Sequence, residues 1–202
     1  MKHLRQGAKG VNFGLLYGSG AKGLQAYCKA TYGVELSLDD AVAFKELFHT
    51  KYAGFTEWQR LIVKHSQEHE EVESPYCRLT RHFKDSDYFK GEFRADPYTI
   101  CMNYPVQSGA WEILALAIKF IHKAKPEGIK ISHHVYDELI LLSPESMKNI
   151  AAKLLYDGFA YGYKTVFPGC SVKGICEVSW GRNWADLSNP ENIITLHNTT
   201  IG

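Results

Sequence analysis

The sequence predicts an α+β fold in which helices dominate and a small antiparallel sheet lies in the second half of the chain. Apolar residues recur at helical spacing between residues 41 and 52 and again between residues 106 and 121. Two short β-rich runs, at residues 129–135 and 139–142, flank a tight connection and predict a hairpin. The chain has 202 residues, 45% of them hydrophobic, which is enough for one substantial core or for one domain with an appended piece.

Composition excludes several classes of protein. No apolar run approaches the roughly 20 residues that a membrane-spanning helix needs, so we expect a soluble chain without a membrane partner. Five cysteines without a C-x-x-C pair indicate reduced thiols in a cytoplasmic setting, or in the host cytoplasm for a virus-encoded chain, rather than a disulfide framework or a zinc site. The net charge is only +1, but residues 1–34 contain five Lys or Arg residues and no acid. The positive charge is therefore concentrated at the start of the chain.

Residues 5–17 predict a helix with one unusual face. Arg5, Lys9, Phe13 and Tyr17 recur at every fourth position, and at about 100° per residue each step overshoots a full turn by about 40°. The four residues therefore share one gently winding face, two cations followed by two aromatic rings. This face suits a molecule with phosphates at one end and a flat ring beyond, such as a nucleoside triphosphate. An ordinary surface helix with scattered charges is the alternative.

Three glycines, Gly7, Gly10 and Gly14, lie inside the same helix. Each destabilises a helix by about 1 kcal/mol relative to Ala. We interpret them as positions where a second backbone or a substrate approaches closely, with Gly18 and Gly20 as hinge material.

The next segments predict a helical scaffold. A short helix over 21–30 stops at Gly33, and Ser37 is the expected N-cap of a helix that continues to about Tyr52. Gly54 is expected to separate it from a second helix that carries residues 55–65. Residues 72–83 predict two extended segments around a turn at Ser74, and the polar residues 84–98 predict a loop.

The longest helical pattern is expected to open at Asn103, with Pro105 in its first turn. Asn103 and Gln107 are four positions apart and so share a face. Two uncharged amides on one face can donate to the acceptors that all base pairs present in the minor groove. Capping of the helix by Asn103 explains the same residues without DNA.

Asp137 and Glu138 lie at the tip of the predicted hairpin. Rigid strands can hold a carboxylate in place for a divalent metal, but Asp is also a common turn residue. Beyond the hairpin, Ser143 is expected to cap a helix of about 18 residues whose Ile150 faces inward, followed by a strand over 172–178 and a polar tail over 188–202.

The segment R-x3-K-x7-Y-G, with Phe13 between the Lys and the Tyr, resembles motif B of the family A DNA polymerases, the bacterial DNA polymerase I type. In that family this is the fingers helix that closes over the incoming nucleotide. The resemblance implies that Arg5, Lys9, Phe13 and Tyr17 bind the dNTP and that Lys9 also takes part in catalysis.

Two later segments carry the resemblance to DNA contacts. N-x-P-x-Q at Asn103 and Gln107 resembles the family's primer–template contact segment, although Thr99 stands where the family commonly has Arg. Ser74-Pro-Tyr-Cys-Arg78 resembles its Thr-x-x-Gly-Arg segment, with Cys in place of Gly. The resemblance implies DNA contacts by Asn103, Gln107 and Arg78.

The hairpin resembles motif C, His-Asp-Glu, with Tyr136 in place of the His. This implies that Asp137 is a Mg²⁺ ligand in a two-metal site and that Asp137 and Glu138 are catalytic. The ending Trp180-Gly-Arg-Asn-Trp184 resembles the family's C-terminal strand and terminus.

The resemblance implies a family A fold of fingers helices and part of an antiparallel palm sheet, with activity in template-directed DNA synthesis. Residues 1–70 correspond to the fingers-like part, residues 71–187 to the C-terminal part of the palm, and residues 188–202 to a tail. The family's motif A, which carries a second metal-ligand Asp, precedes motif B and has no counterpart in these 202 residues. We therefore expect a C-terminal fragment whose partners are primer–template DNA, dNTPs and a complementary chain that carries motif A. The alternative is a non-catalytic remnant that binds nucleotide or DNA.

Overall fold

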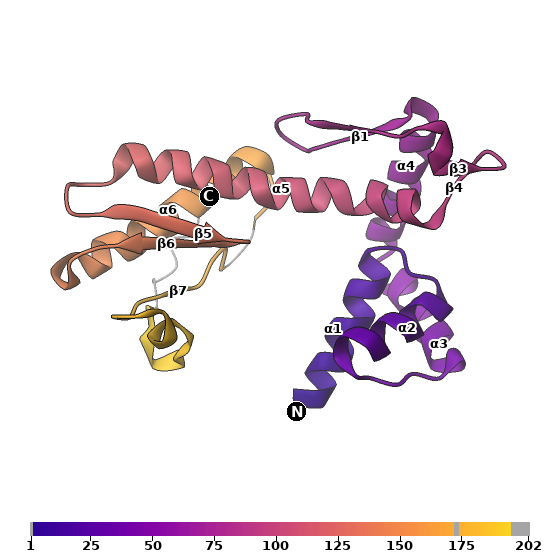
Figure 1. The fold of residues 1–202 in the computed structure, drawn as a ribbon, viewed down its shortest axis with the longest axis horizontal. Coiled ribbons are helices and arrows are strands. Elements are labelled where there is room, and N and C mark those ends of the chain that lie inside the picture. Colours follow the sequence, from indigo (N-terminus) through magenta and orange to yellow (C-terminus); the bar gives the residue numbers. More distant parts are fainter. Residues whose placement is uncertain (1, 172–173, 195–202) are drawn as a thin grey trace. The chain divides into compact units, whose positions relative to one another are not determined.

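The computed structural model describes residues 2–171 and 174–194; the side chains of residues 2–6, 95, 188 and 190 lie outside the described part. Most of the described chain is helical, and the strands pair in small antiparallel sheets (Figure 1). The helices are α1 (Lys2–Leu16), α2 (Ala21–Tyr32), α3 (Leu38–Lys51), α4 (Ala53–His69), α5 (Ala95–Ala124) and α6 (Lys148–Val166). The chain forms two compact units, Met1–Ser74 with Leu79–Val106 and Pro75–Arg78 with Gln107–Gly202. No helix among the described residues is long and apolar enough to cross a membrane.

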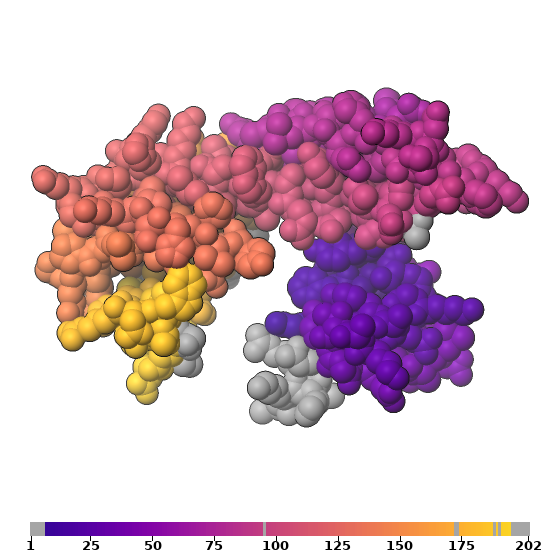
Figure 2. All heavy atoms as spheres, in the orientation of Figure 1, coloured from indigo at the N-terminus to yellow at the C-terminus, as the bar shows by residue number. Residues whose placement is uncertain are grey.

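In the first unit, α1 packs on α2 through its glycines. A Cβ atom on Gly10 would lie 2.9 Å from Cys28 Sγ, and one on Gly14 would lie 2.6 Å from Leu24 Cδ1. The glycines therefore bring the two helices close together, as the sequence predicted. The atoms of α1, α2 and α3 fill one continuous block (Figure 2). Its core consists of Leu15, Leu24, Cys28, Ala41 and Phe48.

The scaffold helices follow the sequence prediction closely. Gly33 ends α2 with a left-handed φ of 65°, and the Ser37 side chain accepts from the Asp40 backbone N–H at the start of α3. The break between α3 and α4 falls at Tyr52 rather than at Gly54, which lies inside α4.

The segment before α5 is more ordered than expected. Strands β1 (Glu71–Glu73) and β2 (Thr80–His82) pair in antiparallel register, which confirms the predicted extended segments. The prediction of a loop over 84–98 is wrong. In this segment β3 (Tyr88–Phe89) and β4 (Glu92–Phe93) form a second hairpin, and α5 begins at Ala95.

Helix α5 starts eight residues before Asn103, so Pro105 lies inside the helix and not in its first turn. Asn103 is therefore not an N-cap, and that interpretation is wrong. The physical reason is burial, since Cys101 and Met102 are 0% and 1% exposed in a core that they share with Val72. This core keeps residues 95–103 helical, although Pro105 cannot donate to the carbonyl of Cys101.

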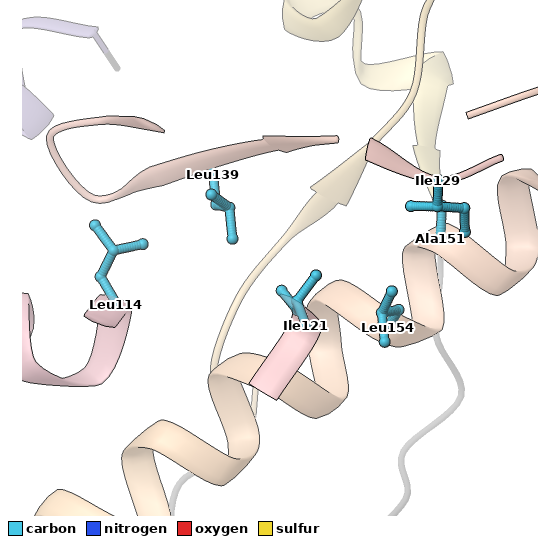
Figure 3. Packing of buried hydrophobic residues seen from close by; sticks show 6 residues of the cluster. All are labelled: Leu114, Ile121, Ile129, Leu139, Ala151 and Leu154. Carbon is cyan, nitrogen blue, oxygen red and sulfur yellow. The ribbon is translucent and has the colours of Figure 1, made fainter. Parts of the chain in front are cut away.

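In the second unit, strands β5 (Lys130–Val135) and β6 (Glu138–Leu142) form the predicted hairpin. Figure 3 shows the core that joins this hairpin to α5 and α6. Helices α5 and α6 approach closely, because a Cβ atom on Gly162 would collide with the backbone carbonyl of Ile113. The core residues are Leu114, Ile121, Ile129, Leu139, Ala151 and Leu154.

The C-terminal elements differ from the prediction in three ways. A 3₁₀ turn, Glu145–Met147, precedes α6, which has no side-chain N-cap, and Ile150 is 52% exposed rather than inward. The strand predicted over 172–178 is reduced, in the described part, to β7 (Val178–Ser179), and residues 172–173 lie outside the described residues. Within the predicted tail, β8 (Ile193–Ile194) pairs with β7, and residues 195–202 lie outside the described part.

Candidate functional site

Three of the four predicted nucleotide-binding side chains lie in the described part of the structure: Lys9 and Phe13 on α1, and the half-buried Tyr17 in the turn that follows it. Lys9 is exposed and Phe13 is 39% exposed, although Gly10 and Gly14 of the same helix are packed against α2. The Phe13 and Tyr17 rings stack with centroids 6.4 Å apart and planes 17° apart. The backbone of Arg5 belongs to α1, but its side chain lies outside the described part. The described face thus offers a cation followed by two parallel rings.

Two sets of hydrogen bonds fix the C-terminal end of α1. Gly18 adopts a φ of 77°, and the Gly18 and Ser19 N–H groups donate to the carbonyls of Leu15 and Gly14 in the Schellman pattern. The buried Gln59 amide of α4 donates to the carbonyls of Leu15 and Leu16 at 3.1 and 3.0 Å. These contacts satisfy helix-end carbonyls and hold Tyr17 at a defined position.

Tyr27 of α2 has a phenol with a raised pKa. Burial, helped by a hydrogen bond with Tyr32, raises the pKa of Tyr27 to about 12. The raised pKa keeps this phenol, which interacts electrostatically with Tyr17, neutral well above neutral pH.

Asn103 and Gln107 lie one turn apart on α5, so they share a side of this helix as predicted. Gln107 is exposed. The Asn103 Oδ1 atom is buried without a hydrogen-bond partner among the described residues. A buried amide oxygen without a hydrogen-bond partner is uncommon in a folded protein.

The loop Pro75–Arg78, termed the Arg78 loop below, packs on α5 within the second unit. Arg78 is exposed and has a φ of 56°, which is unusual for a residue with a side chain. Glu112, only 1% exposed, accepts from the backbone N–H groups of Tyr76 at 3.0 Å and Cys77 at 2.7 Å. Desolvation and the Glu112 carboxylate raise the pKa of the Cys77 thiol, so it stays protonated.

The hairpin presents its carboxylates at the turn. Val135 pairs with Glu138, so Tyr136 and Asp137 alone form the two-residue connection. Tyr136 is 93% exposed and has a φ of 55°. A non-glycine residue at such an angle in a tight turn is strained by about 1–3 kcal/mol and is commonly found at functional sites. Asp137 and Glu138 are both exposed.

Asp137 and Glu138 also line a cleft of about 1140 Å³ within the second unit. Its other walls come from the β5–β6 hairpin, α5, α6 and the segment that starts at Ile175. His133 of β5 stacks on Trp184 with ring centroids 5.4 Å apart, so the predicted C-terminal motif lies beside the hairpin.

A hard cation such as Mg²⁺ prefers carboxylate oxygens, and the exposed Asp137 fits that preference. The described residues contain no group of three or more His, Cys, Asp or Glu side chains arranged to hold a metal.

The structure divides the predicted site residues between the two units. Lys9, Phe13, Tyr17 and Asn103 belong to the first unit, together with the backbone of Arg5. The second unit contains Gln107, Arg78, Asp137 and Glu138.

The sequence analysis missed two buried residues that hold parts of the candidate site, Gln59 and Glu112. Gln59 carries no sequence signal, because a polar residue in a surface-like helix gives no indication of burial. Glu112 has a faint one, since it is an isolated acid in an apolar helical segment.

Comparison with known proteins identifies the family. The sequence profile of DNA polymerase family A matches residues 1–186. The chain belongs to this family, as its motifs predicted. DNA polymerase I of Aquifex aeolicus is 36% identical over 69% of this chain, and thermostable DNA polymerase I of Thermus thermophilus is 27% identical over 90% of it. The chain spans 23% and 20% of the lengths of these two relatives.

A solved structure shares the fold. The POL domain of Pol1 from M. smegmatis, in complex with DNA primer-template and dNTP, superposes with a TM-score of 0.69. It is 22% identical, and the match covers 81% of this chain and 28% of that one. The described fold, mostly helical with small antiparallel sheets, is therefore that of part of a DNA polymerase I polymerase domain.

Proposed function

We propose that this chain forms the C-terminal portion of a template-directed DNA polymerase, which transfers dNTPs to a primer 3′-hydroxyl. The observation that carries the proposal is the exposed face of α1. Glycines pack this helix against α2, and Lys9 and Phe13 remain exposed beside the packed side. Family membership over residues 1–186 supports the same reaction class.

In this proposal α1 binds the incoming nucleotide. Arg5 and Lys9 hold the triphosphate, because a guanidinium grips phosphate oxygens in pairs and an ammonium acts as a point charge. Lys9 also stabilises the charge that develops on the leaving pyrophosphate. Phe13 packs against the sugar, and Tyr17, held by the fixed end of α1, lies beyond it.

DNA contacts come from α5 and the Arg78 loop. Asn103 and Gln107 donate to minor-groove acceptors and so test base-pair geometry without reading sequence. Arg78 contacts a backbone phosphate. The M. smegmatis POL domain was solved in complex with primer-template and dNTP, which supports the assignment of these two ligands.

Asp137 is the proposed Mg²⁺ ligand, with Glu138 beside it. Two bound Mg²⁺ ions would activate the primer hydroxyl and neutralise the leaving phosphates. The strained turn fixes Asp137 at the end of two strands, so little reorganisation is needed when a cation is bound.

A site of this type needs carboxylates from two segments, and the described residues contain no group of three or more side chains arranged to hold a metal. We propose that a separate polypeptide carrying motif A completes it. In the complete enzyme, residues 1–70 would act as the fingers-like part and residues 71–187 as the C-terminal part of the palm.

Primer extension by a reconstituted complex tests the proposal. The 202-residue chain is mixed with a separately made polypeptide carrying a family motif A, and extension of a labelled primer is followed with and without Mg²⁺. We expect Mg²⁺-dependent extension that Asp137→Ala abolishes. Glu127→Ala, which removes an exposed acid from the same unit, should leave it intact.

Two results would change the conclusion. Binding of dNTP and primer–template by the complex without any extension would favour the non-catalytic remnant. Robust extension by the 202-residue chain alone would show that it carries a second carboxylate we have not recognised.

A further inference from the structure

Glu112 is a buried acid that the proposed chemistry does not use. Its side chain is 1% exposed in α5. A buried carboxylate is strongly destabilising unless it is hydrogen-bonded. Here Oε2 accepts from the Tyr76 N–H and Oε1 from the Cys77 N–H, at 3.0 and 2.7 Å. Both oxygens of Glu112 are therefore committed to the backbone of one loop.

The Arg78 loop rests on α5 at two neighbouring points. Besides the Glu112 hydrogen bonds, the Pro75 ring lies over Gly109, where an added Cβ atom would be 3.0 Å from Pro75 Cγ. Gly109 and Glu112 are three positions apart and so share one side of the helix. The loop has no freedom to shift along α5 without breaking one of these contacts.

The anchored loop ends at Arg78 in a strained conformation. A φ of 56° is unfavourable for a residue with a side chain and persists only where neighbouring contacts impose it. The two hydrogen bonds to Glu112 lie directly before Arg78 in the chain. An Arg side chain presented from a fixed backbone loses less freedom on binding than one presented from a mobile loop.

We propose that Glu112 is a positioning residue for nucleic-acid binding: it fixes the Arg78 loop on α5 so that the Arg78 guanidinium meets a backbone phosphate of the primer–template. This inference rests on the proposed function, in which Arg78 contacts DNA. Glu112 itself does not touch the DNA.

The direction of the change in DNA affinity on substituting Glu112 distinguishes the positioning role from a purely electrostatic effect of its charge. Neutralising an acid near a DNA-binding surface removes repulsion and, by charge alone, strengthens DNA binding. Glu112→Gln keeps the shape but loses the charge and one acceptor oxygen, so it releases one of the two loop N–H groups. If Glu112 positions Arg78, this substitution weakens DNA binding instead.

The test compares Glu112→Gln, Arg78→Ala and the double variant in the reconstituted complex. Glu127→Gln, which neutralises an exposed acid of the same unit, is the matched control. Primer–template affinity is measured by fluorescence anisotropy over a series of salt concentrations. Arg78→Ala should reduce the salt slope by about one and weaken binding by about tenfold. Glu112→Gln should cause a loss of similar size, and the double variant should lose no more than Arg78→Ala.

Amide hydrogen exchange provides a second readout that needs no DNA. In the Glu112→Gln chain the Tyr76 and Cys77 amides should exchange faster, while those of β5 and β6 remain protected and show that the unit is folded.

Four outcomes would overturn the inference. They are unchanged or stronger DNA binding by Glu112→Gln, losses that add in the double variant, normal binding by Arg78→Ala, and faster loop exchange without weaker binding. If no variant and no wild-type complex binds primer–template, the proposed function fails as well. Normal binding and extension by Glu112→Gln contradict the positioning role alone.

Discussion

Lys9 and Phe13 are exposed on α1, whereas Gly10 and Gly14 pack against α2. At the residue scale, the sequence spacing was sufficient to predict this face. It could not predict the Gln59 amide that fixes the end of α1 or the Glu112 carboxylate that holds the Arg78 loop. Both depend on contacts between residues more than 30 positions apart, which no local pattern records.

Lys9→Ala should weaken nucleotide use without weakening DNA binding. A charge-assisted contact to phosphate is worth roughly 1.5–3 kcal/mol, so we expect the apparent KM for dNTP to rise about 10- to 100-fold. Steady-state primer extension and primer–template anisotropy measure the two effects. Lys22→Ala, which removes an exposed lysine from α2, is the control. Loss of DNA affinity with unchanged KM would reassign Lys9 to the DNA.

Phe13→Tyr should relax discrimination against dideoxynucleotides. A phenyl ring offers no hydrogen bond, so the sugar's own 3′-hydroxyl completes the local hydrogen bonding when a deoxynucleotide is bound. The added phenol can substitute for that hydroxyl. Competition between dideoxy and deoxy substrates measures the ratio, and Phe13→Leu separates the hydroxyl from the ring. A ratio that Tyr does not change would remove Phe13 from the sugar site.

At the scale of elements, local signals predicted α1, α2, α3 and the β5–β6 hairpin. Local start and stop signals mark them, such as Ser37 as the N-cap of α3 and Gly33 as the C-cap of α2. Helix α5 was predicted too short, because Pro105 was interpreted as a helix start. Burial of Cys101 and Met102 extends the helix through that proline, and burial is a tertiary property.

Glycines in two helices should respond to alanine with opposite signs. Gly162→Ala places a Cβ atom against the Ile113 carbonyl, so α5 and α6 must separate, and we expect a destabilisation of about 1–3 kcal/mol. Gly23→Ala in α2 meets only Ser19 Cβ at 3.8 Å and should stabilise by about 0.5–1 kcal/mol through helix propensity. Urea unfolding of the two variants measures both changes. Equal effects of the same sign would show that helix propensity, and not the close helix contact, decides stability at Gly162.

At the scale of the whole molecule, the order of the motifs along the chain was the main basis for predicting the family. Four motifs in the family's order indicated a family A polymerase, and the profile match over residues 1–186 confirms the family. The two compact units could not be predicted, since α5 continues from one into the other without a linker or a change in composition. The roles of the individual site residues stay predictions.

The metal dependence of stability tests how the whole site is assembled. One exposed turn carboxylate competes poorly with water for Mg²⁺, whereas carboxylates from two segments share the charge of a bound ion. Mg²⁺ should therefore leave the melting temperature of the 202-residue chain unchanged and raise that of the complex with the motif A polypeptide. At a concentration ten times Kd, binding stabilises by about 1.4 kcal/mol, or about 3–6 °C for a domain of this size. Asp137→Ala should abolish the shift while the complex stays intact by size-exclusion chromatography, and EDTA should reverse it in the unaltered complex. A shift of the same size in the chain alone would place a complete metal site within these 202 residues.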